Sequence, residues 1–288
     1  MNCRHYEENS LRKVHKLGFG HLLLNITVIS VLLFLVLPAF IVIPMSFGSS
    51  EYLKFPPVDF SLKWYSEFIK SERWVGSLWL SLQVAVCTTV IATLVGTLAS
   101  LAMTRGNFPG KALVNTIIIS PMIVPVIILA IAIYGLYAKL GMIGTRAGLV
   151  SAHTVLALPY VFLIMTSNLH QFDISLELAA MNLGANRIKT FFFVTLPLIF
   201  PGMMTSAIFA FITSFDELVV ANFISGIRGT TLPKQMFDGI RLEVSPVVAS
   251  VSSILIVVSI VTILLLQSLR SEEPKSQEGR SLGSKIDI

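Results

Sequence analysis

Residues 177–197 read ELAAMNLGANRIKTFFFVTLP and lie between two long apolar runs. The polar composition of this stretch predicts a water-facing loop. It nevertheless contains two alanines, a glycine and a Leu-Pro step at fixed distances, at Ala179-Ala180, Gly184 and Leu196-Pro197. A plain connector between two membrane helices needs no such pattern, because connecting segments tolerate wide sequence variation. The pattern therefore raises the question of what this loop contacts.

The composition of the whole chain predicts an integral membrane protein. Of its 288 residues, 54% are hydrophobic and 13% are charged, whereas soluble domains carry about 25% charged residues. The formal net charge of +5 does not indicate nucleic-acid binding, because no basic run with interleaved aromatic residues is present. Strand alternation of the outer-membrane type is also absent from the sequence, which favours an all-α protein.

Six segments are apolar and long enough to cross a bilayer as helices of about 20 residues. They are 22–46, 78–103, 112–137, 148–168, 194–220 and 247–268. The chain then divides into an N-terminal segment at 1–21, a six-helix transmembrane domain at 22–268 and a polar tail at 269–288, for which disorder is predicted. Several spans contain proline, at Pro121, Pro125, Pro159 and Pro201, and we expect kinks at these positions.

Basic residues next to the first span predict the orientation of the chain. Arg12, Lys13 and Lys16 precede that span, and the positive-inside rule places such a cluster in the cytoplasm. Six crossings return the C-terminus to the same side. The loop between the fourth and fifth spans then also faces the cytoplasm.

Within this loop, the sequence predicts a short helix at about 173–187. Asp173 or Ser175 is suited to its N-cap, and Glu177 in the first turn suits the helix dipole. Asp173, Glu177, Ala180 and Gly184 recur at helical spacing and share one face, while Gly184 also reads as a helix stop. A second helical piece is expected at about 186–193. On spacing alone, an amphipathic helix resting on lipid is an equal alternative.

The spacing of the loop resembles the EAA loop of inner-membrane permease subunits of binding-protein-dependent ABC importers. The residues that carry the resemblance are Ala179, Ala180, Gly184, Val194, Leu196 and Pro197. In that family the loop forms a coupling helix that docks on a cytoplasmic ATPase, which implies an ATPase-coupling role for Glu177, Ala179, Ala180, Gly184, Leu196 and Pro197. One departure concerns the acidic residue that usually precedes the alanines. Leu178 occupies that position here, and Glu177 lies one residue earlier, about 100° away around a helix.

Three further stretches are similar to the spermidine/putrescine subfamily of these permeases: residues 55–69, 214–226 and 231–246. The resemblance implies a type I importer fold in the bacterial inner membrane, with a core bundle formed by spans two to six. It implies a second homologous permease subunit, two ATPase subunits that bind ATP and Mg²⁺, and a periplasmic substrate-binding protein as partners, besides membrane lipid. It also implies polyamines or related small cationic or amine-bearing solutes as substrates.

Two adjacent carboxylates, Asp216 and Glu217, lie at the end of the apolar segment 194–220. A charge deep in a bilayer costs about 2.5 kcal/mol or more, so such residues usually face a cavity or a partner. Asp216 lies about 28 Å along a helix from Pro197, which places the pair near the outer end. We interpret this pair of carboxylates as an acidic outer edge of the translocation path, which attracts a cationic solute and takes part in the outer gate. Phe215 beside it is interpreted as a cation–π surface. For the carboxylates the alternative is a structural ion pair or an interfacial hydrogen bond, and for Phe215 a packed aromatic ring is the favoured alternative.

The sequence contains no motif for catalysis, nucleotide binding or metal binding. The Gly110-Lys111 pair is followed by Ala112, so a phosphate-binding loop is absent. For His153 we favour a hydrogen-bonded helix histidine over a metal ligand or proton relay. We therefore expect a non-catalytic subunit with no cofactor of its own. The alternative is a proton-coupled secondary transporter in which Asp216 or Glu217 titrates. An intramembrane enzyme is disfavoured, because adjacent helical residues diverge too far to flank one bond.

Overall fold

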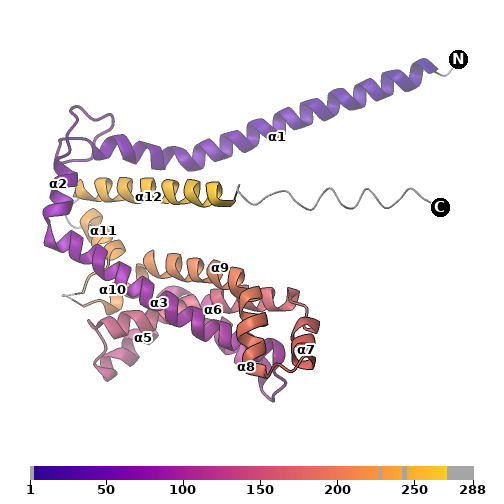
Figure 1. Cartoon of the computed structure of the whole chain (residues 1–288). Helices are drawn as coiled ribbons and strands as arrows, with labels where there is room; N and C mark the ends of the chain where they lie inside the picture. The colour runs from indigo at the N-terminus through magenta and orange to yellow at the C-terminus, as the bar shows by residue number, and fades with distance from the viewer. Residues whose placement is uncertain (1–2, 227–228, 242–244, 271–288) are drawn as a thin grey trace. The chain divides into compact units, whose positions relative to one another are not determined.

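The computed structural model describes residues 3–226, 229–241 and 245–270, and this part of the chain is almost entirely helical (Figure 1). Its only extended pairing is an isolated bridge between Gly48 and Phe60. The chain divides into two compact units. Unit 1 comprises Met1–Phe68 with Val244–Ile288, and unit 2 comprises Ile69–Glu243.

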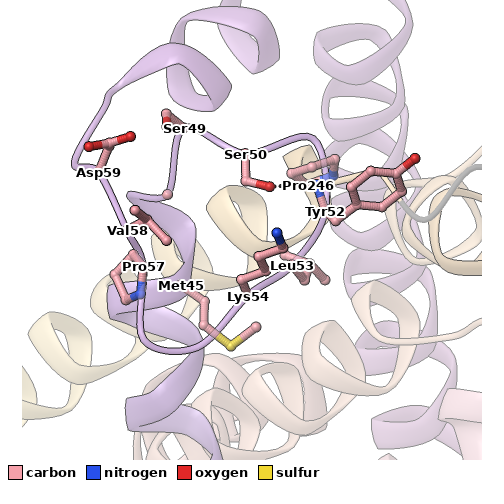
Figure 2. Close-up of a pocket in the computed structure, with 11 residues that line it drawn as sticks. Met45, Ser49, Ser50, Tyr52, Leu53, Lys54, Pro57, Val58, Asp59 and Pro246 are labelled. Atoms are coloured by element: carbon pink, nitrogen blue, oxygen red, sulfur yellow. Dashed lines mark hydrogen bonds between the residues drawn. The ribbon is translucent and has the colours of Figure 1, made fainter.

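Unit 1 pairs the first and last long helices of the chain. Helix α1 (Cys3–Ser46) and helix α12 (Val247–Arg270) lie side by side (Figure 1). After α1, Ser46 Oγ lies 2.6 Å from the hydroxyl of Tyr65, at the start of α2 (Lys63–Lys70). The intervening loop encloses a hollow of about 20 Å³ beside Pro246 (Figure 2). This space is large enough for one water molecule but too small for an organic solute.

Three long helices form the core of unit 2: α3 (Glu72–Arg105), α6 (Arg146–Gln171) and α9 (Leu196–Phe215). Small residues let α3 and α6 approach closely, because a Cβ atom added at Gly96 would lie 2.9 Å from Cβ of Val161. At the same interface, Ser100 Oγ donates a hydrogen bond of 3.0 Å to the carbonyl oxygen of Phe162. Small residues and polar cross-links of this kind are typical of helix packing in membranes.

The segment predicted as one span at 112–137 is two helices. Helix α4 (Lys111–Ile123) and helix α5 (Val126–Leu140) meet at an angle of 108°. Pro125 has no backbone N–H and disfavours the helical conformation at the residue before it. Val124 is accordingly extended, with ψ of 132°. The kink predicted at Pro125 is therefore confirmed, and whether α4 and α5 together make one broken span stays a prediction. Pro159 and Pro201, in contrast, lie inside continuous helices.

The predicted span at 194–220 also has different bounds. Its helical path begins earlier, with α8 (Arg187–Thr190) and the π-helical turn η1 (Phe191–Thr195), and α9 ends at Phe215. A separate short helix, α10 (Val219–Ile224), follows and packs on α5. Helix α11 (Leu232–Arg241) packs on α3, where its first backbone N–H, that of Leu232, donates to Ser81 Oγ at 2.7 Å.

The described residues contain four helices long and apolar enough to cross a membrane, or five if α4 and α5 count as one broken span. In α12, the apolar helix found among these residues is shorter, at Val247–Val261. The count of six crossings therefore stays a prediction. The predicted disordered tail lies mostly at 271–288, outside the described residues.

The contact between α3 and α6 provides a test of this packing. Gly96→Ala is expected to destabilise the protein by about 1–3 kcal/mol, because the new Cβ forces the two helices apart. Gly76, on the same helix, has open space around the equivalent position. Gly76→Ala is the matched control and should leave stability unchanged or raise it by up to about 1 kcal/mol. The measurement is the midpoint of thermal unfolding in detergent, and equal midpoints for the two variants would contradict the packing.

Candidate functional site

Helix α7 (Ser175–Asn182) forms the predicted short helix after α6. The backbone N–H of Ser175 donates to Asp173 Oδ1 at 2.9 Å. This hydrogen bond lowers the pKa of the Asp173 carboxyl below its ordinary value. Glu177 lies in the first turn, where a negative charge is favoured by the helix dipole.

The predicted helix stop at Gly184 is confirmed. Gly184 adopts a φ of +91°, in the left-handed region that favours glycine. The backbone N–H groups of Leu183 and Ala185 donate to the carbonyls of Ala179 and Ala180, at 3.0 and 3.1 Å. These bonds satisfy carbonyls that the helix end would otherwise leave unpaired. The helix is shorter than the predicted range of 173–187.

After the stop, the chain turns directly into the next long helix. Asn186 caps α8, because its Oδ1 accepts from the backbone N–H of Lys189 at 2.8 Å. Helix α8, η1 and α9 then follow without an intervening loop. Leu196 and Pro197, the last residues of the quoted stretch, form the start of α9. Helix α7 is thus joined to a 20-residue helix by a short, hydrogen-bonded connection.

Glu177 does not face away from the bundle. Its Oε1 accepts a hydrogen bond from Arg105 Nη2 at 3.2 Å and another from Thr195 Oγ1 at 2.9 Å. Arg105 is the last residue of α3, and its guanidinium carbon lies 5.2 Å from the centre of the Phe172 ring. Sequence reasoning did not find Arg105 or Thr195. The four side chains join the end of α3, the end of α6, the start of α7 and the end of η1.

Several large apolar side chains of α7 and its flanking segments are exposed. Leu183 is 90% exposed. The other large apolar side chains exposed around it are Ile174, Leu176, Leu178, Met181 and Ile188. Of the remaining predicted coupling residues, Ala179, Gly184 and Pro197 are exposed and Ala180 and Leu196 are half-buried. Six exposed large apolar side chains within residues 174–188 indicate a surface for protein or membrane contact.

The two predicted carboxylates lie at the break between α9 and α10 and not within one helix. Asp216 terminates α9 and is exposed. Glu217 is only 9% exposed, and its two carboxylate oxygens accept the backbone N–H groups of Val220 and Ala221, each at 2.9 Å. The 100° divergence expected for neighbours on a helix therefore does not apply. Phe215 stacks on Phe211 with ring centroids 5.7 Å apart.

His153 of α6 lies beside this break. Its Nδ1 is 2.9 Å from Ser214 Oγ and 3.1 Å from the Ser214 carbonyl oxygen, which confirms the prediction of a hydrogen-bonded helix histidine. Its Nε2 lies 3.8 Å from Glu217 Oε2. Among the described residues, no group of three or more His, Cys, Asp or Glu side chains is arranged to hold a metal ion.

The sequence matches the family described as "Binding-protein-dependent transport system inner membrane component" over residues 92–271, a range that contains α7 and both carboxylates. The chain belongs to this family. The permease is 33% identical to the putrescine transport system permease protein PotI of Escherichia coli, over 77% of this chain and 82% of PotI. It is 30% identical to the spermidine/putrescine transport system permease protein PotC of the same organism, over 90% of this chain and 98% of PotC.

Among solved structures, the permease is similar to a chain of a bacterial ABC transporter involved in the import of the acidic polysaccharide alginate. The TM-score is 0.64 at 17% identity, covering 89% of this chain and 96% of that chain. The protein therefore has the type I ABC permease fold and is a non-catalytic, multi-pass subunit of the inner membrane. Family membership implies partnership with an ATPase and a binding protein. A proton-coupled secondary transporter finds no support.

The break between α9 and α10 yields a stability prediction. Glu217→Ala should destabilise the permease by about 2 kcal/mol or more, because two buried N–H groups lose their acceptors. Asp216→Asn, at the exposed neighbouring carboxylate, is the control and should change stability by less than about 0.5 kcal/mol. Thermal unfolding in detergent measures both. An Asp216 variant that is as unstable as the Glu217 variant would refute this assignment of the two carboxylates.

Proposed function

We propose that the permease forms part of an inward translocation path for polyamines or related small cationic or amine-bearing solutes. The observation that carries the proposal is the similarity to two permeases named for putrescine and spermidine/putrescine, which extends over 77% and 90% of this chain. An exposed carboxylate at the break after α9 supports it, since an acidic group attracts a cationic solute.

The energy for transport comes from a partner ATPase pair that binds ATP and Mg²⁺. Helix α7 supplies the contact with that ATPase through the exposed apolar surface around Leu183. In the orientation predicted from the basic residues near the N-terminus, both termini and α7 lie in the cytoplasm. A periplasmic binding protein delivers the solute on the other side, and a second homologous permease subunit completes the path.

The three residues proposed for the path and its outer gate have different tasks. Both oxygens of the Glu217 carboxylate accept backbone N–H groups, so this side chain holds the shape of the break. Asp216 is exposed and supplies the negative charge that attracts the solute. Phe215 is stacked on Phe211 and presents only its remaining ring surface to a cation.

The proposed contact between α7 and the ATPase is tested by placing a charge in it. Leu183→Asp should reduce the amount of ATPase that co-purifies with the permease by about tenfold, because burying a carboxylate in an apolar interface is costly. Leu62, a 65% exposed leucine of unit 1, is the matched position. Leu62→Asp should leave co-purification unchanged. Equal ATPase recovery with both variants would remove the α7 surface from the interface.

The proposed role of Asp216 predicts a change in substrate affinity. Asp216→Asn should raise the putrescine concentration for half-maximal uptake by about two- to fivefold, as expected for loss of one exposed charge interaction. The effect should shrink at high salt because exposed charges are screened. Asp59→Asn, at an exposed acid of the unit 1 loop, should have no effect. Uptake kinetics identical to the unsubstituted protein would place Asp216 outside the path.

The energy source and the solute are tested on the assembled complex. Uptake into vesicles should require ATP and the ATPase and should survive a proton uncoupler. Mass spectrometry of the solute that co-purifies with the complex should identify an amine-bearing cation. Uptake that continues without ATP, or a bound solute without a positive charge, would overturn the corresponding part of the proposal.

A further inference from the structure

We infer that Arg105 is a positioning residue for transport, because it holds Glu177 of α7 in a cross-link that joins α7 to both α3 and η1. The inference rests on the proposed function, in which an ATPase moves α7. The cross-link consists of the hydrogen-bonded ion pair from Arg105 to Glu177, at 3.2 Å, and the hydrogen bond from Thr195 to the same carboxylate oxygen, at 2.9 Å.

Little else in the described part of the chain fixes α7 to the bundle. None of the side chains of α7 is buried. Its packing contacts are mainly with η1 and α8, the elements that follow it in the chain. The contact with Arg105, by contrast, joins positions 72 residues apart in the sequence. Without it, α7 remains joined to α6 and α9 by the short chain segments on either side and loses this ion pair to α3.

The surroundings strengthen this ion pair beyond an ordinary surface contact. The Arg105 and Glu177 side chains are 25% and 17% exposed. Phe172 lies against the guanidinium on one side, which limits its hydration and adds a cation–π contribution. The charges also suit their helix ends, because Arg105 is in the last turn of α3 and Glu177 is in the first turn of α7. Water screens partly buried pairs less than exposed ones.

The position of Thr195 explains why the cross-link matters for movement. Thr195 is the last residue of the π-helical turn η1 and directly precedes α9. Single π turns interrupt regular helical hydrogen bonding and occur often at functional sites. A side-chain contact between this turn and α7 stiffens the connection where the backbone is least regular. When the ATPase moves α7, the cross-link then makes α3 and α9 move with it, so that α7 does not tilt alone.

The experiment measures coupling and not only activity. The permease is reconstituted in proteoliposomes with its ATPase and binding protein, and solute moved per ATP hydrolysed is determined for each variant. Arg105→Gln should lower this ratio by at least threefold while the ATPase still co-purifies, and Arg105→Lys should restore part of it. Lys111→Gln is the matched control, because Lys111 contacts the Gly106 carbonyl nearby at 3.1 Å. It should keep the original ratio.

A double-mutant cycle separates the cross-link from independent effects. If Arg105 and Glu177 act through one contact, Arg105→Gln combined with Glu177→Gln should lower the ratio no further than the worse single variant. Independent, multiplying losses would overturn the inference. If Arg105→Gln does not assemble, Thr195→Val replaces it in the test, because it removes one hydrogen bond to Glu177 and no charge. An unchanged ratio in Thr195→Val would then overturn the inference.

Different results would refute the proposed function and the proposed role of Arg105. If the unsubstituted permease transports without ATP or binds no ATPase, the proposed function is wrong. If it transports with ATP and Arg105→Gln assembles with the original ratio of solute to ATP, the proposed function stands and the role of Arg105 is refuted. Lower thermal stability with an unchanged ratio likewise assigns Arg105 a structural role only and refutes the inference.

Discussion

A helix that breaks inside an apolar bundle leaves backbone N–H and carbonyl groups without partners, and the permease depends on pairing them locally. At the break between α9 and α10, Glu217 supplies acceptors for two N–H groups. At the exposed end of α7, outside the bundle, the φ of +91° at Gly184 lets the N–H of Ala185 pair with the Ala180 carbonyl. In hydrocarbon, each unpaired group costs several kcal/mol. At the break after α9, the Glu217 side chain therefore replaces the partners that a continuous helix would supply.

Four carboxylates near helix ends of unit 2 fall into two groups, according to whether they hold structural elements together. Glu177 and Glu217 are turned inward and hold elements together through hydrogen bonds. Asp173 and Asp216, in comparison, are exposed next to a helix end. A buried carboxylate whose oxygens accept backbone N–H bonds is poorly suited to binding and releasing a solute, because each cycle would break those bonds. The exposed Asp216 carboxylate does not hold a buried pair of backbone N–H groups in this way.

Hydropathy and capping patterns predicted the parts of the fold that depend on local sequence. The apolar runs were found as helices, and the stop at Gly184 follows from the conformational freedom of glycine. A kink at Pro125 was predicted from the proline, but its angle of 108° was not, since the angle depends on the packing of α5 against α10. The Arg105–Glu177 contact spans 72 residues, which no periodicity reveals. Nor could the sequence tell which of two adjacent carboxylates is buried, because that depends on where α9 ends.

Helix α9 connects the two irregular regions of unit 2, and polar contacts hold it at both ends. Next to its first residue, Thr195 is bonded to Glu177, and near its last residue Ser214 is bonded to His153 of α6. Helices α7 and α10 lie at opposite ends of unit 2 (Figure 1). At 1.5 Å per residue, the 20 residues of α9 separate these contacts by about 30 Å. Because α9 continues unbroken through Pro201, a single helix joins the Thr195 contact to the Glu217 break.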